Sequence, residues 1–312
     1  MQNTEPKIIK VAAGILINSK NEVLISQRLS SQPWPNYWEF PGGKVEENES
    51  LEECLSRELF EEIGINPVSY SEWITREFLQ DDRIIKITFF KIIRWAGEIK
   101  KKEVNDYKWI DVEKISSWPK KILPKNIYVL KALILPSYYL ITNFFEDENF
   151  IRKVIDSKDI WVQFREPFLS IDKIHCSYEV LKQRCTSKIL INSRHKNAII
   201  CKHGIHFTSK DLNNIEKLDK KIINCASVHN LDEVNRANKL GFDFIVLSQI
   251  KKTLSHPERE GMGWDKFKKI VNHSDIPVYA LGGLSPSDLA EAQKNGAVGI
   301  SSQRDGWSSL LN

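Results

Sequence analysis

The chain has 312 residues, of which 41% are hydrophobic, and this length is sufficient for two domains with separate cores. Its 45 basic and 41 acidic residues give a formal net charge of only +4, so no overall field indicates binding to nucleic acid or to a membrane. The five cysteines form no CxxC pair, and no apolar run approaches the roughly 18 residues of a membrane span. We therefore expect a cytoplasmic protein with reduced thiols and neither a disulfide framework nor a zinc site.

The first part of the chain alternates strands with one strong helix. Apolar runs predict strands at 8–18, 22–28 and 83–95. A helix is expected over Ser50–Ile63, and a second helix over 127–135 ends before Pro136. We therefore expect a first domain over 1–135, with its boundary at this proline.

After Pro136 the pattern changes to short apolar runs that are separated by polar or helical segments. Eight runs follow one another: YYLIT, IWVQF, KILIN, GIHFT, IINCA, FDFIVLS, PVYALGG and AVGIS. Such runs are typical of parallel strands buried on both faces, and eight of them close a (β/α)₈ barrel of the TIM type. The second domain, 137–312, is predicted to be this barrel with short loops, so the chain as a whole is of the α/β class.

The helix expected at 50–63 carries carboxylates beside its apolar stripe. On a helical wheel, Glu58, Glu61 and Glu62 adjoin and partly overlap the stripe formed by Leu51, Leu55, Leu59 and Ile63. The ordinary interpretation of a glutamate-rich helix is a solvated acidic face. Carboxylates next to an apolar face, however, repel one another and lose solvation unless a cation neutralises them. The pattern therefore predicts a site for Mg²⁺ or Mn²⁺, which bind oxygen ligands and, for Mg²⁺, substrate phosphates.

A glycine-containing turn precedes this helix. Pro41, Gly42 and Gly43 predict a tight turn in which glycine permits a close approach of the backbone. Lys44 follows, where its ammonium group can meet a phosphate. Alone the turn indicates only a reversal of the chain. Its combination with the carboxylates is what favours phosphate chemistry.

The stretch from Gly43 to Ile65 resembles the Nudix box. Gly43, five residues, Glu49, seven residues and then RELFEEIGI match G-x5-E-x7-R-E-U-x-E-E-x-G-U at every specified position, where U is aliphatic. The resemblance implies an α/β/α sandwich with a mixed sheet and Mg²⁺-dependent hydrolysis of a nucleoside diphosphate linked to another group. It implies an ion pair between Glu49 and Arg57 that supports the site. The metal ligands that it implies are Glu58, Glu61 and Glu62. We also expect Gly42 and, from the segment GEIKKKE outside the box, Glu103 to bind the metal.

The flanking segments are similar to the MutT branch, which removes pyrophosphate from oxidised guanine nucleotides. The matching segments are SQR, WEFPGGK, LPKN, GEIKKKE and, with one extra residue, QDDRIIKITFF. The similarity implies a purine packed on Phe40 and read at its edge by the amide of Asn126. Singly, these residues have structural roles in a core, a hairpin turn or a helix cap. The nucleotide-binding residues implied together are Arg28, Phe40, Lys44, Asp82, Arg83 and Asn126.

The reaction implied by this resemblance is displacement by water at the β-phosphorus, which yields a nucleoside monophosphate and pyrophosphate. The base could be Glu58, Glu61 or Glu103, and the sequence does not choose among them. The expected substrate is 8-oxo-dGTP, so the expected role is sanitation of the nucleotide pool in support of DNA repair and replication. Two alternatives stay open: hydrolysis of a thiamine-pathway pyrophosphate, and a phosphate sensor without turnover.

The second domain resembles thiamine-phosphate synthase and its relative, the thiazole tautomerase TenI. The segments that carry the resemblance are WVQFRE, ILINSR, GIHFTSKD, ASVHN, ALGGL and GAVGISS. Pro167 or Phe168 stands where the family has a lysine, and Ser193 stands where it has an aspartate. The chain thus lacks a cation and a metal-binding carboxylate that would hold Mg²⁺ and pyrophosphate.

We therefore expect a degenerate barrel that has no synthase activity. The glycine turn at Gly282 and Gly283 and the turn at Ser301 are expected to retain a site for a small phosphate, as in other barrels of this type. His206, Ser227 and His229 are expected to have structural roles.

Overall fold

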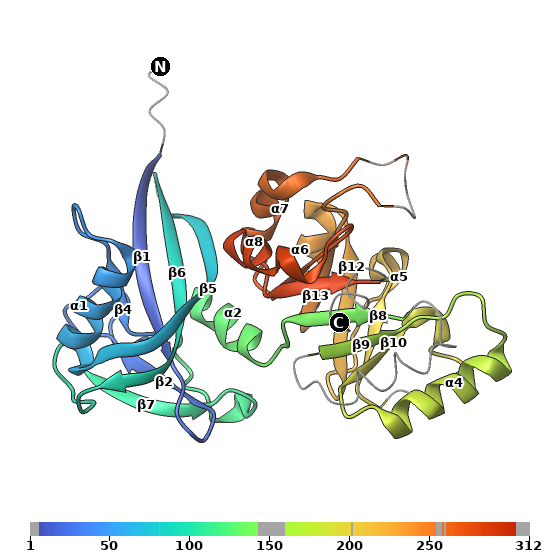
Figure 1. Ribbon diagram of the computed structural model, residues 1–312, viewed down its shortest axis with the longest axis horizontal. Coiled ribbons are helices and arrows are strands. Elements are labelled where there is room, and N and C mark those ends of the chain that lie inside the picture. The colour runs from blue at the N-terminus through green and yellow to red at the C-terminus, as the bar shows by residue number, and fades with distance from the viewer. Residues whose placement is uncertain are drawn as a thin grey trace, which may run out of the picture. The chain divides into compact units, whose positions relative to one another are not determined.

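The chain folds into two compact units, residues 1–134 and 135–312. The computed structural model describes residues 6–80, 82–142, 160–200, 202–253, 258 and 260–303 (Figure 1). None of the helices in these ranges is long and apolar enough to cross a membrane. The described cysteines are free thiols, and Cys201 lies outside the described residues.

The N-terminal unit contains two sheets and two α-helices. Its strands are β1 (Lys7–Leu16), β2 (Glu22–Gln27), β3 (Trp38–Glu39), β4 (Gly42–Lys44), β5 (Asn66–Gln80), β6 (Arg83–Ala96) and β7 (Asp106–Asp111). Its helices are α1 (Leu51–Ile63), η1 (Ile115–Ser117) and α2 (Pro124–Leu133). One sheet is mixed, in the order β4-β1-β6-β5 with β1 and β6 parallel, and the other is antiparallel, in the order β3-β2-β7. This is the mixed-sheet architecture that the sequence predicts.

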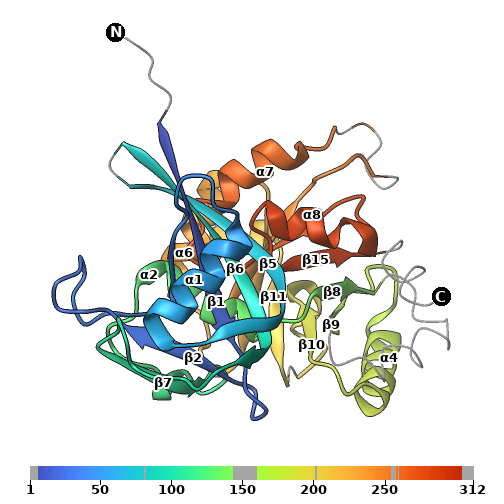
Figure 2. The ribbon, with the colours of Figure 1, turned by 60° about the vertical axis from the view of Figure 1, so that its left-hand side comes forward.

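Local sequence defines both ends of α1. Ser50 caps the helix and forms a reciprocal capping box with Glu53, while Gly64 ends it in the left-handed conformation at φ 79°. The apolar stripe packs against β1 and β4 in one buried cluster with residues of β6 (Figure 2). Burial of this stripe holds the adjoining edge of the helix, which carries Glu58 and Glu62, against the backbone of β4.

Several elements differ from the sequence-based prediction, and one of them is strand β4, which contains Gly42 and Gly43 where a tight turn was expected. Strand β5 was not expected, because it is an edge strand whose first half alternates exposed and half-buried side chains and whose pairing contains register shifts. The helix expected at 127–135 instead spans Pro124–Leu133. Pro124 suits the first helical turn, and the residues just before Pro136 are disfavoured in a helix.

The C-terminal unit is a closed barrel of eight parallel strands in the order β10-β11-β12-β13-β14-β15-β8-β9. All eight apolar runs singled out from the sequence form its strands. They are β8 (Tyr138–Ile141), β9 (Ile160–Phe164), β10 (Ile189–Asn192), β11 (Gly204–Phe207), β12 (Ile223–Val228), β13 (Phe244–Ser248), β14 (Val278–Leu281) and β15 (Gly299–Ser302). The described helices are α4 (Ile171–Arg184), η2 (Ser193–His195), α5 (Ser209–Asn214), α6 (Leu231–Leu240), α7 (Gly263–Val271), η3 (Pro286–Asp288) and α8 (Leu289–Lys294).

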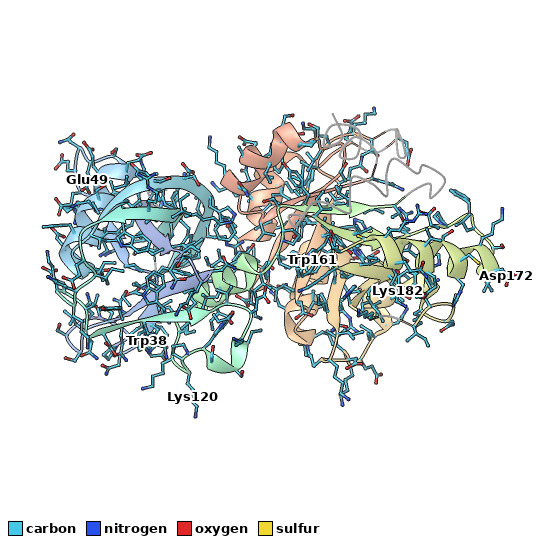
Figure 3. All side chains as sticks on the ribbon, turned by 60° about the horizontal axis from the view of Figure 1, so that its bottom comes forward. Trp38, Glu49, Lys120, Trp161, Asp172 and Lys182 are labelled. Atoms are coloured by element: carbon cyan, nitrogen blue, oxygen red, sulfur yellow. The ribbon has the colours of Figure 1, made fainter. Side chains whose placement is uncertain are left out.

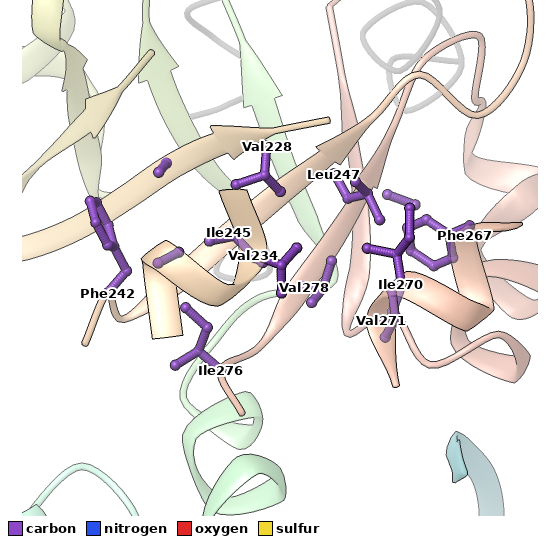
Figure 4. Packing of buried hydrophobic residues seen from close by; sticks show 14 of the residues in the cluster. Val228, Val234, Phe242, Ile245, Leu247, Phe267, Ile270, Val271, Ile276 and Val278 are labelled. Atoms are coloured by element: carbon purple, nitrogen blue, oxygen red, sulfur yellow. The ribbon is translucent and has the colours of Figure 1, made fainter. Parts of the chain in front are cut away.

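Two layers of side chains stabilise the barrel. Outside the strands, apolar residues pack under the helices in one buried cluster, in which Val228 and Ile245 lie near Val234 of α6 (Figure 4). Inside, rings from different strands meet, since Tyr139 stacks on His206 and contacts Phe244 and Tyr279 edge-on or tilted. Trp161 of β9 also contacts Phe244 edge-on, with 6.0 Å between ring centroids. The interior is therefore a packed aromatic core.

Candidate active site

Strand β4, which comes before α1, brings its backbone against the glutamates of the helix. Gly42 has φ 144°, and a Cβ atom at this position would overlap the carbonyl oxygen of Ala12. A Cβ at Gly43 would overlap the carboxylate of Glu58. Gly42 therefore requires glycine, and the Glu58 carboxylate rests directly on the backbone at Gly43.

Arg57 forms ion pairs with three of the glutamates through its guanidinium group. Its Nε lies 2.8 Å from Glu49 Oε1, and its Nη1 lies 2.9 Å from Glu58 Oε1 and 3.1 Å from Glu61 Oε2. Its Nη2 also donates to the carbonyl of Lys44, 3.1 Å away, and thus ties the helix to β4. Hydrogen bonds from Arg57 hold the pKa of Glu49 at about 2. The expected ion pair between Glu49 and Arg57 is present, and Glu49 lies at the periphery of the unit (Figure 3).

Glu62 has less compensation for its charge. Its Oε2 accepts a hydrogen bond of 3.1 Å from the Gly42 N–H. Burial raises the pKa of Glu62 to about 8, and the negative charges of Glu39 and Glu58 add to this effect. Burial likewise raises the pKa of Glu58, in opposition to Arg57. The site therefore holds more negative charge than its own cations neutralise.

Sequence reasoning missed Glu39. Its two carboxylate oxygens lie 2.7 and 2.8 Å from Arg28 Nη1, and Arg28 Nε donates to the carbonyl of Pro33 at 2.7 Å. Burial raises the pKa of Glu39, although Arg28 opposes the shift. The signal was available in WEFPGGK, because alternation along an extended segment places Glu39 opposite Phe40 and away from the core that Phe40 enters.

Phe40 and Asn126 lie together and interact with each other through a hydrogen bond. Phe40 is 3% exposed and meets Phe89 edge-on, with 6.0 Å between ring centroids. Its backbone N–H donates to Asn126 Oδ1 at 2.9 Å. The carbonyl oxygen of the Asn126 amide is therefore engaged within the protein, and its NH₂ group is the part that remains for a ligand.

Asp82 and Arg83 lie at the turn between β5 and β6. They are 88% and 56% exposed and face each other at 3.6 Å. In the sheet register, Arg83 lies beside Lys7, whereas Lys44 lies beside Val11, four residues further along β1. Lys44 is exposed at the end of β4. The structure thus separates Asp82 and Arg83 from Lys44 along the sheet.

The loop between β6 and β7 carries Glu103 to the C-terminal end of α1. The backbone N–H groups of Lys102 and Glu103 donate to the carbonyl of Glu62, at 3.1 and 3.3 Å. The N–H of Lys100 donates to the carbonyl of Ile63 at 2.9 Å. These bonds satisfy carbonyl groups that a helix end leaves without partners, and they place Glu103, which is exposed, next to Glu62 along the backbone.

The donor atoms of this site fit a divalent cation. Carboxylate oxygens and nearby backbone groups are the ligands that Mg²⁺ and Mn²⁺ accept, and the raised pKa values of Glu58 and Glu62 reflect charge that a cation would stabilise. In the described ranges, no three His, Cys, Asp or Glu side chains are positioned to hold a metal ion together. Arg57 instead provides the positive charge beside Glu58 and Glu61.

In the barrel, hydroxyl groups satisfy the carboxylate of Asp211, which lies in α5. Ser193 Oγ and Thr208 Oγ1 both donate to Asp211 Oδ2, at 2.6 and 2.7 Å. Burial pushes the pKa of Asp211 upward, but these hydrogen bonds outweigh it and hold the pKa below its usual value. Asp211 is therefore satisfied without a metal ion, and these residues do not fit a Mg²⁺ site.

The predicted glycine turn of the barrel lies at the end of β14, whereas Ser301 lies within strand β15 and not in the turn that was expected there. Gly282 and Gly283 have φ values of 116° and 65°, which favour glycine, and the carbonyl of Gly282 accepts from Lys251 N–H at 2.9 Å. Ser301 is fully buried, and its Oγ has no hydrogen-bond partner among the described residues. This hydroxyl is a polar group that a ligand could satisfy.

Comparison with known proteins assigns each unit. The model of the NUDIX domain family matches residues 8–133, and the thiamine monophosphate synthase model matches residues 138–305. The 8-oxo-dGTP diphosphatase of Escherichia coli (strain K12) is 38% identical over 106 residues, which cover 34% of this chain and 82% of the relative. The chain belongs to the Nudix and thiamine monophosphate synthase families.

Two further relatives support the assignment. The Aquifex aeolicus protein named "Putative thiamine-phosphate synthase 2" is 33% identical over 176 residues, which cover 53% of this chain and 95% of the relative. The CTP pyrophosphohydrolase of Escherichia coli (strain K12) is 30% identical over 128 residues, covering 41% of this chain and 93% of the relative. The expected fusion of a Nudix domain with a thiamine-phosphate-synthase-like barrel is confirmed.

Proposed function

We propose that the Nudix domain is a Mg²⁺-dependent pyrophosphohydrolase that converts 8-oxo-dGTP to 8-oxo-dGMP and pyrophosphate, with Mn²⁺ as an alternative ion. The observation that carries the proposal is the complete Nudix box of a chain that is 38% identical to an 8-oxo-dGTP diphosphatase over 82% of that protein. The box is assembled around Arg57, which brings Glu49, Glu58 and Glu61 to one point.

The residues that would hold the cation are Gly42, Glu58, Glu61, Glu62 and Glu103. When bound, a divalent ion offsets phosphate charge and makes a water molecule more acidic. The Gly42 N–H orients Glu62, and Arg57 orients Glu58 and Glu61. Proton transfer from the attacking water falls to Glu58, Glu61 or Glu103. The raised pKa of Glu58 suits a proton acceptor, because a base is more effective when its pKa approaches the working pH.

Recognition of the nucleotide is assigned to residues on both sides of the box. Glu39 and Pro33 fix the guanidinium of Arg28, and the NH₂ group of Asn126 can donate to an acceptor on the purine edge. Lys44 can approach the phosphates from the end of β4. The proposed nucleotide-binding residues also include Phe40. Asp82 and Arg83, which lie at the β5–β6 turn, belong to the same proposed set.

A substrate panel in Mg²⁺ tests this proposal. The substrates are 8-oxo-dGTP, dGTP, CTP, ADP-ribose and thiamine pyrophosphate, and the quantities measured are kcat/KM and the phosphate product. We expect the highest kcat/KM for 8-oxo-dGTP, with release of pyrophosphate. Equal rates for 8-oxo-dGTP and dGTP would contradict the choice of an oxidised base, and a preference for thiamine pyrophosphate would favour the thiamine-pathway alternative. Lack of turnover on every compound would favour a sensor.

For the barrel we propose a degenerate thiamine-phosphate-synthase fold that binds a small phosphate monoester and does not couple pyrimidine and thiazole substrates. The observation that favours this role is the contrast between Asp211, which two hydroxyl groups satisfy, and the buried Ser301 hydroxyl, which has no partner in the described part of the chain. Calorimetric titration of the full chain with thiazole phosphate should show weak, Mg²⁺-independent binding. Robust coupling activity would contradict the proposal.

A further inference from the structure

The C-terminal end of α1 lacks a positive charge of its own. Its last turn contains no basic residue, although the aligned peptide dipoles place partial negative charge at this end. The carbonyl of Phe60 accepts the N–H of Gly64 at 3.1 Å. The carbonyl groups at this end of the helix therefore depend on another segment for a cationic partner.

Lys102 supplies that compensation from the β6–β7 loop. Its Nζ donates to the carbonyl of Phe60 at 3.0 Å and lies 3.7 Å from the centroid of the Phe60 ring. The aliphatic part of its side chain passes over Gly64, where an added Cβ would lie 3.3 Å from Lys102 Cε. The Phe60 ring, 49% exposed, is thus covered by a cation and its alkyl chain.

The same residue also fixes the backbone next to Glu103. The N–H of Lys102 donates to the carbonyl of Glu62 at 3.1 Å, and the N–H of Glu103 shares this acceptor at 3.3 Å. The neighbouring lysines make other contacts, since Lys100 Nζ pairs with Glu98 at 2.8 Å and Lys101 Nζ pairs with Asp106 at 2.7 Å. Of these three lysines, only Lys102 has its ammonium group on the helix end.

We propose that Lys102 is a positioning residue that fastens the β6–β7 loop to the last turn of α1 and so holds Glu103 beside Glu62 for cation binding. The proposal rests on the proposed function, because Glu103 matters only if the site binds a divalent ion. Lys102 acts through Glu103 and has no contact with the substrate. Its removal loosens the loop without altering the core, since the Lys102 side chain is exposed.

The test compares Mn²⁺ affinity, measured from the electron paramagnetic resonance of free Mn²⁺, with kcat and KM for 8-oxo-dGTP. Lys102→Met keeps most of the alkyl chain and removes the charge. We expect about five- to tenfold weaker Mn²⁺ binding, because the variant loses the interactions of a cation with the helix end and with the Phe60 ring. The value of kcat should fall in parallel while KM changes less than about twofold. Lys102→Arg, which keeps the positive charge, should retain the wild-type Mn²⁺ affinity and kcat. Lys100→Met, which removes the same charge from the same loop, should resemble the wild type.

A double-mutant cycle separates positioning from a general effect of charge. In a Glu103→Gln background, Lys102→Met should weaken Mn²⁺ binding no further, because the residue through which Lys102 acts is already altered. Equal Mn²⁺ affinity of Lys102→Met and wild type, or full additivity with Glu103→Gln, would overturn this proposal alone. A wild-type chain that neither binds Mn²⁺ nor hydrolyses nucleotides would overturn the proposed function as well.

Discussion

The Nudix domain and the barrel both contain carboxylates at their candidate sites, but the two domains stabilise the negative charge of these groups differently. In the Nudix domain, burial and neighbouring negative charges raise the pKa of Glu62 to about 8, and one backbone N–H is its hydrogen-bond donor. In the barrel, hydroxyl groups of Ser193 and Thr208 satisfy Asp211 and help to hold its pKa below the usual value. A carboxylate left without compensation marks a place for a cation, whereas one that is satisfied by hydroxyl groups does not.

The largest effect should come from removing a carboxylate of the Nudix helix. Glu61→Gln or Glu62→Gln should lower kcat for pyrophosphate release by about 10²–10³-fold or more, because the charge that holds the cation is reduced. The fold should persist, since each change relieves repulsion in the cluster. Glu52→Gln, on the exposed first turn of the same helix, is the matched control and should retain normal kcat. Near-normal turnover of either site variant would show that the ligand assignment is wrong.

The second effect concerns the barrel interior in acid. His206 is buried, and burial lowers its pKa to about 3 while Tyr139 and Ser227 hydrogen bond to its ring. The unfolded chain takes up a proton below about pH 6.5 and the folded barrel does not, so stability should fall as the pH drops from about 6.5 to 3. The loss should reach about 3–5 kcal/mol at most, at about 1.4 kcal/mol per pH unit.

Hydrogen exchange of barrel peptides as a function of pH measures this change separately from the Nudix domain. His206→Gln should flatten the dependence between pH 6.5 and 3, and His229→Gln, which alters an exposed histidine after β12, should not. An acid dependence unchanged in His206→Gln would assign the titration to another group.

The Nudix domain should respond to pH in the opposite direction when it is free of metal. The folded-state pKa of Glu62 lies above its ordinary value of 4.5, so the folded domain holds a proton that the unfolded chain releases. Stability that is present below about pH 4.5 is therefore lost as the pH rises to about 8. Because Glu62 is only partly buried, we expect a loss of about 2–3 kcal/mol, below the full linkage value. Hydrogen exchange of Nudix peptides in EDTA should show it, and Glu62→Gln should abolish it.

The sequence predicted those features that depend on local spacing. The box residues lie within 23 positions of one another, so one helix and one turn bring Gly43, Glu49 and Glu58 together. The barrel followed from eight apolar runs, because each strand is short and buried on both faces.

Contacts between distant segments were less accessible to sequence reasoning. Asn126 engages the backbone of Phe40, 86 residues away, and no local pattern indicates that bond. Strand β5 was missed because its exposed residues give no continuous apolar signal. The alternation in WEFPGGK indicates on which side of the segment Glu39 lies, but the effect of its charge on Glu62 depends on the folded chain.

The smallest effect should come from Ser193, whose hydroxyl group donates to Asp211 in the barrel. Ser193→Ala removes one of two hydroxyl donors from Asp211 and should destabilise the barrel by about 1–2 kcal/mol, the range for hydrogen bonds to charged groups. Turnover by the Nudix domain should be unchanged. Ser193→Asp replaces the hydroxyl donor with a second carboxylate, which repels the negative charge of Asp211. That variant should be less stable than wild type in EDTA and should regain stability in millimolar Mg²⁺, as a pair of carboxylates gains from a cation. Thermal unfolding of wild type, Ser193→Ala and Ser193→Asp with and without Mg²⁺ measures the difference. A Mg²⁺-dependent rise in barrel stability that is equally large in wild type would mean that the hydroxyl groups have not replaced the ion, and that the two domains are less different than their hydrogen bonds indicate.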